Sequence, residues 1–143
     1  MLLLSQCEDF PLTQEDVDHL LKAVQTNINV PDSDIALACV SAQEIQRLNM
    51  EYRKKNAPTN VLAFSYDDKD HDIAFCMSIA REEAVARTIA LRDYVALLIV
   101  HALLHVSGLD HEESKEHRAH MEQKEREILL ACGFVPQGLL DVY

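Results

Sequence analysis

Three closely spaced histidines are the residues of this chain best suited to chemistry. They are His101, His105 and His111, in the run His-Ala-Leu-Leu-His-Val-Ser-Gly-Leu-Asp-His that starts at residue 101. Positions i and i+4 of an α-helix share one face, about 6 Å apart along the axis, so His101 and His105 can share one small cation. Gly108 can take the left-handed conformation that ends a helix, and the turn there can bring His111 round as a third ligand.

This spacing predicts a catalytic metal site. Three neutral imidazoles leave one position of a tetrahedral zinc ion open for water, as catalytic zinc sites do. We therefore expect one Zn²⁺ per chain on His101, His105 and His111, and another divalent transition metal would also suit imidazole ligands. A single histidine on an apolar face is more often a hydrogen-bonded core residue, but three at this spacing favour the metal.

The residues around the histidines limit the reaction. Metzincin metalloproteases share this ligand spacing and carry a glutamate base directly after the first histidine. This chain has Ala102 there, which argues against a peptidase of that type but leaves a zincin-like fold open. A phosphodiester suits the site, because a cation and an arginine stabilise its anionic transition state. Arg53, from the basic run Arg53-Lys54-Lys55, is the leading arginine candidate, although such a run is often only a solvated surface.

Asp110 lies directly before the third histidine, and two roles for it remain open. Its carboxylate can orient His111 or act on the attacking water. It can equally be a turn carboxylate that accepts hydrogen bonds from local backbone N–H groups.

The rest of the sequence predicts strands and helices that would hold these histidines in place. Apolar runs bounded by turn residues predict strands at 2–4, 35–40, 61–65 and 73–79. Capping residues and apolar stripes predict helices at 13–27, 41–50, 81–90, 91–107 and 114–132, with Gly133 ending the last one. Turns are expected at 31–33 and 67–72, and the polar segment 51–60, which contains Pro58, is expected to be irregular.

The helix at 91–107 should be the centre of the fold. It is almost wholly apolar from Tyr94 to Leu104, so we expect it to be buried and to hold the imidazoles on rigid backbone. The sequence therefore predicts an α+β fold, with a small mixed β-sheet packed against helices and the metal site at the end of a buried central helix.

Length and composition indicate one domain over residues 1–143. The apolar share of 48% is enough for a core, and no stretch is long and apolar enough to span a bilayer. No signal peptide is evident, so we expect a cytoplasmic protein without a membrane partner. The net charge of −11 argues against a general nucleic-acid binder, apart from the local basic run. The four cysteines are far apart without a C-x-x-C pair, so we expect small buried thiols rather than disulfides.

Two blocks of the sequence resemble the YbeY family of bacterial metal-dependent endoribonucleases. The family signature is close to H-G-x-L-H-L-x-G-Y-D-H, and this chain matches its three histidines, glycine and aspartate, departing at Ala102, Val106 and Leu109. The second block starts at Leu48-Asn49 and continues with Tyr52-Arg53-x-Lys55-x-x-Pro58-Thr59-Asn60-Val61-Leu62-x-Phe64. A further departure is His71, before Asp72-Ile73, where the family usually has glycine.

The resemblance implies a zinc-dependent endoribonuclease specific for single-stranded RNA. It implies catalytic roles for Arg53 and Asp110, RNA binding by Arg53 and Lys55, and metal binding by the three histidines. The implied role is maturation of ribosomal RNA, including the 3′ end of 16S rRNA, and ribosome quality control, with the ribosome or ribosomal proteins as partners.

Two alternatives remain beside the ribonuclease. One is a metallohydrolase of another substrate class, such as a peptide or a small ester. The other is a ribosome assembly factor with a structural metal. The remaining histidines do not decide between these alternatives: His117 and His120 are expected to face solvent on the last helix, and His19 and His71 belong to no pattern.

Overall fold

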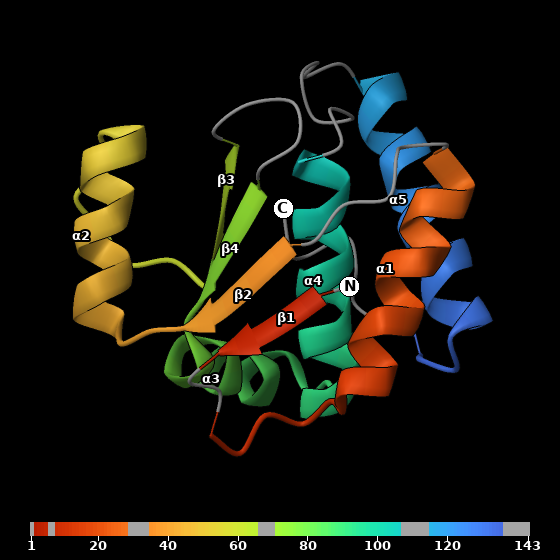
Figure 1. Cartoon of the computed structure of the whole chain (residues 1–143), viewed down its shortest axis with the longest axis horizontal. Helices are drawn as coiled ribbons and strands as arrows, with labels where there is room; N and C mark the ends of the chain where they lie inside the picture. The colour runs from red at the N-terminus through yellow and green to blue at the C-terminus, as the bar shows by residue number, and fades with distance from the viewer. Residues whose placement is uncertain (1, 6–7, 29–34, 66–70, 107–114, 136–143) are drawn as a thin grey trace.

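The chain folds into one mixed β-sheet with helices on both faces (Figure 1). The structure is a computed structural model that describes residues 2–5, 8–28, 35–65, 71–106 and 115–135. Its strands are β1 (Leu2–Ser5), β2 (Ile35–Cys39), β3 (Val61–Ser65) and β4 (His71–Phe75). The helices in these ranges are α1 (Gln14–Ile28), α2 (Ala42–Arg53), α3 (Met77–Arg87), α4 (Leu91–Val106) and α5 (Lys115–Ala131).

The strand order β1-β2-β4-β3 places β3 at one edge of the sheet. β1 pairs with β2 and β2 with β4 in parallel, whereas β3 and β4 are antiparallel. In Figure 1, α2 lies against one face and α4 against the other, with α1 and α5 beyond α4. The predicted α+β class with a small mixed sheet is therefore confirmed.

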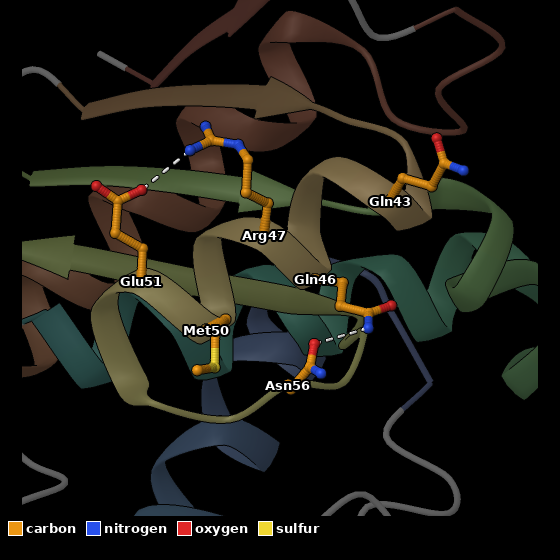
Figure 2. A pocket seen from close by; sticks show the side chains of 6 residues that line it. All are labelled: Gln43, Gln46, Arg47, Met50, Glu51 and Asn56. Atoms are coloured by element: carbon orange, nitrogen blue, oxygen red, sulfur yellow. Dashed lines mark hydrogen bonds and ion pairs between the residues drawn. The ribbon is translucent and has the colours of Figure 1, made fainter.

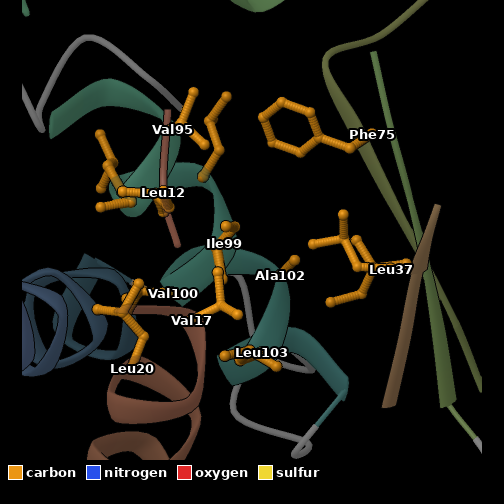
Figure 3. Packing of buried hydrophobic residues seen from close by; sticks show 14 of the residues in the cluster. Leu12, Val17, Leu20, Leu37, Phe75, Val95, Ile99, Val100, Ala102 and Leu103 are labelled. Carbon is orange, nitrogen blue, oxygen red and sulfur yellow. The ribbon is translucent and has the colours of Figure 1, made fainter. Parts of the chain in front are cut away.

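Helix α4 is the centre of the core, as its apolar sequence predicts. Every residue from Tyr94 to Leu104 except His101 is at most 2% exposed. Figure 3 shows α4 between sheet residues such as Leu37 and Phe75 and residues of α1 such as Val17. Each large apolar side chain buried in this way contributes about 1.5–3 kcal/mol relative to exposure, so the backbone that carries the histidines is firmly held.

Local hydrogen bonds explain where the helices begin and end. The Thr13 hydroxyl accepts from the Asp16 N–H at 3.1 Å, and the Asp16 carboxylate accepts from the Thr13 N–H at 2.9 Å. The Ser41 hydroxyl accepts from the Glu44 N–H at 3.1 Å and begins α2. Gly133, with φ +84°, follows α5 in the left-handed conformation expected of it.

Several predicted boundaries are wrong. The helix predicted at 81–90 ends at Arg87, and residues 71–72 of the predicted turn at 67–72 belong to β4. Helix α2 continues past Met50 to Arg53 and ends at Lys54, which takes a left-handed conformation at φ 59°. The predicted strand at 73–79 is instead β4, which ends at Phe75, followed by α3 from Met77. Buried apolar runs suit either a strand or a helix, so periodicity does not locate such a junction. The predicted turn at 31–33, and residues 67–70 of the other turn, lie outside the described residues.

Cys39 differs from the expectation of small buried thiols, whereas Cys76 is a buried free thiol as predicted. Cys39 is disulfide-bonded, whereas Cys76 and Cys132 are free thiols, and Cys7 lies outside the described ranges. The spacing of the cysteines in the sequence does not reveal this bond.

No single helix in the described part of the chain is long and apolar enough to cross a membrane. Helices α3 and α4 pass that test only as a pair, by length and composition, with a bend of 118° between them.

Candidate functional site

His101 and His105 lie side by side near the C-terminal end of α4. Their Nε2 atoms are 3.1 Å apart, and the ring centroids are 4.6 Å apart. The His101 side chain is 17% exposed, and it alone interrupts the buried surface of this part of α4. The structure therefore brings together two of the three predicted ligands, while His111 and Asp110 lie outside the described residues.

Both histidines open into a small pocket that also contains Arg53. The pocket has a volume of about 160 Å³. Part of its wall comes from α4, and part from the residues that lead into β3 and from β3 itself. The lining residues are Arg53, Thr59, Asn60, Val61, Ala63, Leu98, His101, Ala102 and His105.

Arg53 reaches this pocket from the C-terminal end of α2, which extends further than predicted. It is the last residue of α2, and its side chain is exposed. The left-handed turn at Lys54 then redirects the chain toward Thr59 and Asn60. Arg53 and the two histidines therefore line the same pocket. Lys55 is exposed beyond the helix and does not line the pocket.

Glu125 is a site residue that the sequence interpretation missed. This carboxylate on α5 is 0% exposed, and its Oε1 lies 2.8 Å from Nδ1 of His101. The signal was available, because Glu125 falls on the apolar stripe of α5 formed by Met121, Ile128 and Leu129, all buried. A charged residue on a core-facing stripe indicates a buried partner.

A second carboxylate, Glu83 of α3, connects the pocket wall with α4 through hydrogen bonds. The Glu83 carboxylate accepts hydrogen bonds from the Asn60 amide at 2.9 Å and from the Tyr94 hydroxyl at 3.1 Å. Burial, and then the negative charge of Glu83, raise the pKa of Tyr94 to about 12. Tyr94 therefore remains a neutral hydrogen-bond donor over the working pH range.

The donor atoms of the histidine pair fit a metal ion with a preference for imidazole. Two ring nitrogens that face each other are suitable ligands for zinc or another divalent transition metal. In the part of the chain that the structure describes, no group of three or more His, Cys, Asp or Glu side chains is placed to hold an ion. The predicted third ligand, His111, is not in that part.

The other histidines lie apart from this site. His120 is exposed, as predicted, and His117 has no described side chain. His71 begins β4 as an ordinary strand residue without a positive φ, so the absence of glycine there leaves the strand intact. His19 is exposed and lies 4.0 Å from Glu15 on α1.

A second hollow, on the outer face of α2, has a different character. It measures about 590 Å³ and is lined by Gln43, Gln46, Arg47, Met50, Glu51 and Asn56. Figure 2 shows that Arg47 is already paired with Glu51 and that Gln46 is bonded to Asn56. No histidine or cysteine lines this hollow, which makes the pocket at His101 the better candidate for chemistry.

Comparison with known proteins agrees with the blocks singled out in the sequence. The family model described as Endoribonuclease YbeY matches residues 6–133. The chain belongs to the YbeY family. The matched range contains both the histidine run and the Arg53 block, so the resemblance predicted from those residues is confirmed.

Two relatives are similar to this chain over different shares of its length. An Endoribonuclease YbeY of Delftia acidovorans is 39% identical over 106 residues, covering 72% of this chain and 70% of the relative. One of Acinetobacter baylyi is 34% identical over 82 residues, covering 47% of this chain and 52% of the relative. The match thus spans about half of that relative's length.

A solved structure supports the fold. The solution structure of TM1509 from Thermotoga maritima superposes with a TM-score of 0.62, over 92% of this chain and 91% of that one. The sequence identity is 24%, so this likeness supports the α+β fold alone. The finer prediction of a zincin-like fold stays a prediction.

Proposed function

We propose that this YbeY-family chain is a zinc-dependent endoribonuclease that hydrolyses phosphodiester bonds in single-stranded RNA. The observation that carries the proposal is the pocket in which Arg53 meets the paired imidazoles of His101 and His105. A positive side chain beside a metal-binding pair suits an anionic phosphodiester better than a peptide bond. The matched relatives bear the name Endoribonuclease YbeY, which supports the same substrate class.

In this proposal His101, His105 and His111 hold one Zn²⁺ per chain. A bound ion of this kind supplies a Lewis acid and lowers the pKa of its water toward neutrality. Because the backbone of α4 is buried, it holds His101 and His105 in place before the ion binds. Binding then requires less loss of conformational entropy from these two ligands.

Arg53 binds the phosphoryl oxygens and stabilises negative charge as it grows in the transition state. Its planar guanidinium can donate two parallel hydrogen bonds to one phosphate. Lys55, which is exposed two residues further on, is proposed to bind the RNA backbone outside the pocket. For Asp110 the proposal takes the functional role, in which its carboxylate orients His111 or acts on the attacking water, over that of a turn carboxylate.

The biological setting is also part of the proposal. The family resemblance supports ribosomal RNA as substrate, including the 3′ end of 16S rRNA, with a role in ribosome quality control. Ribosomal proteins would supply affinity that a chain of net charge −11 lacks for a free polyanion. We place this work in the cytoplasm, where the ribosome is assembled.

The test uses zinc-loaded chain and one RNA sequence supplied as single strand and as duplex. We expect cleavage of the single strand, loss of cleavage with a chelator, and loss of both zinc and cleavage in His105→Ala. His120→Ala is the matched control, because it removes an exposed histidine of α5. Cleavage by protein that contains no metal would refute the proposal, and turnover of peptides but not RNA would replace it with another metallohydrolase.

A further inference from the structure

We infer that Glu125 is a positioning residue that fixes the proton and the ring orientation of His101, so that Nε2 of His101 is a preformed ligand. The inference deepens the proposed function and rests on the metal site within it. Glu125 belongs to α5 and His101 to α4, so the contact also joins these two helices at the pocket. No part of the sequence motif that contains the histidines points to this residue.

The hydrogen-bond geometry assigns the protons. An ionised carboxylate only accepts hydrogen bonds, so we assign the proton of the 2.8 Å contact to Nδ1 of His101, which then donates to Oε1 of Glu125. In the neutral ring, Nε2 of His101 then carries a lone pair. That lone pair faces Nε2 of His105 at a distance of 3.1 Å. With this proton placement, His101 is already in the tautomer that a metal needs.

The position of Glu125 in the core supports a role beyond stability. Its side chain is 0% exposed, among apolar neighbours of α5 such as Ile128 and Leu129. Burying a carboxylate is costly, and apolar residues of similar volume often replace buried ion pairs without loss of stability. A carboxylate behind a metal-ligating histidine, by contrast, orients the ring and increases the basicity of the ligating nitrogen.

The test measures zinc affinity by competition with a chelating dye, in wild type, Glu125→Gln and Glu127→Gln. Glu127 is an exposed glutamate on the same helix, so its variant removes an equal charge without touching His101. We expect Glu125→Gln to weaken zinc binding about 10- to 100-fold, and Glu127→Gln to leave it within about twofold because exposed charges there are screened. Equal affinity in the two variants would overturn the inference.

A double variant separates positioning from general destabilisation. If Glu125 acts through His101, Glu125→Gln adds no further loss of zinc affinity in a His101→Ala background. Urea unfolding of the metal-free proteins, measured alongside, reports any structural effect. A further loss of zinc affinity in the double variant, equal to that in the single variant, would contradict the inference.

A third measurement needs neither metal nor a variant. The ¹⁵N shifts of the His101 ring in the metal-free wild type report which nitrogen carries the proton. We expect the Nδ1–H tautomer to predominate, and a predominance of Nε2–H would refute the inference. If the wild type binds no zinc, the proposed metal site fails, while this measurement still decides the role of Glu125.

Discussion

Replacing Arg53 tests the chemistry of the pocket most directly. We compare Arg53→Met, which keeps the length of the side chain but removes the charge, with Arg47→Met on the same helix. Arg47 lines the other hollow, on the outer face of α2, and pairs with Glu51 at 3.0 Å (Figure 2). It also pairs with Glu44 at 2.6 Å. The two variants therefore change the net charge equally but remove it from different surfaces.

The expected size of the Arg53 effect follows from its position. Two unit charges about 4 Å apart interact by about 4 kcal/mol near a protein surface. Arg53 is exposed at the rim of an open pocket, so water and salt reduce this to about 2–3 kcal/mol. That free energy corresponds to a loss of about 30- to 150-fold in kcat/KM. Arg53→Lys keeps the charge without the planar fork, and we expect it to fall between wild type and Arg53→Met.

The assay is cleavage of a fluorescent single-stranded RNA by zinc-loaded protein at fixed ionic strength. Arg47→Met should stay within about twofold of wild type, because its charge is already paired with Glu44 and Glu51 and its side chain does not line the pocket. Urea unfolding of each variant checks that the fold is intact. The reasoning fails if Arg53→Met keeps the wild-type kcat/KM, or if Arg47→Met loses as much.

Three further predictions concern the metal, the pH dependence of stability and the backbone. His105→Ala should release zinc, measured by elemental analysis, while His120→Ala keeps it, and zinc retained by both would exclude His105 as a ligand. Because burial and Glu83 raise the pKa of Tyr94 to about 12, the folded chain keeps this proton when the unfolded chain loses it near about pH 10. The contribution of this shift to stability is complete below the unfolded pKa and is lost as pH rises toward 12. In urea unfolding, wild type should therefore lose more stability than Tyr94→Phe between about pH 10 and about pH 12. Equal slopes of the two proteins would contradict this. Gly133→Ala should cost about 1–2 kcal/mol from its left-handed backbone alone, since nothing lies within 4 Å of the added Cβ, and an unchanged urea midpoint would refute that.

Residues that interact within one turn or one helix were predictable from the sequence. The i and i+4 spacing of His101 and His105 depends only on helix geometry, and the burial of α4 depends only on its composition. The capping residues Thr13 and Ser41 act over three positions, and both act as predicted. Short-range rules were therefore enough for the histidine pair and for the helix that carries it.

Contacts between distant segments were not predictable in the same way. Glu125 meets His101 only because α5 packs beside α4, and the sequence marks its burial without naming its partner. The disulfide at Cys39 could not be predicted from the spacing of the cysteines in the sequence. Arg53 was found by its charge and by the family motif, but its place at the end of α2 depends on the left-handed turn at Lys54, a residue without the usual preference for that conformation.

The polar contacts on α4 explain how a small pocket keeps its shape. Tyr94 and His101 lie two turns apart on this helix, and each bonds to a carboxylate of another helix, Glu83 of α3 and Glu125 of α5. Glu83 also holds Asn60, at the point where the pocket wall enters β3. Glu83 thus holds Asn60 in the pocket wall, and Glu125 holds His101 itself. Because these bonds come from separate helices, the proposed function predicts different effects for the two carboxylates. A change at Glu83 should alter the fit of the proposed RNA substrate, whereas a change at Glu125 should alter the affinity of the proposed zinc site.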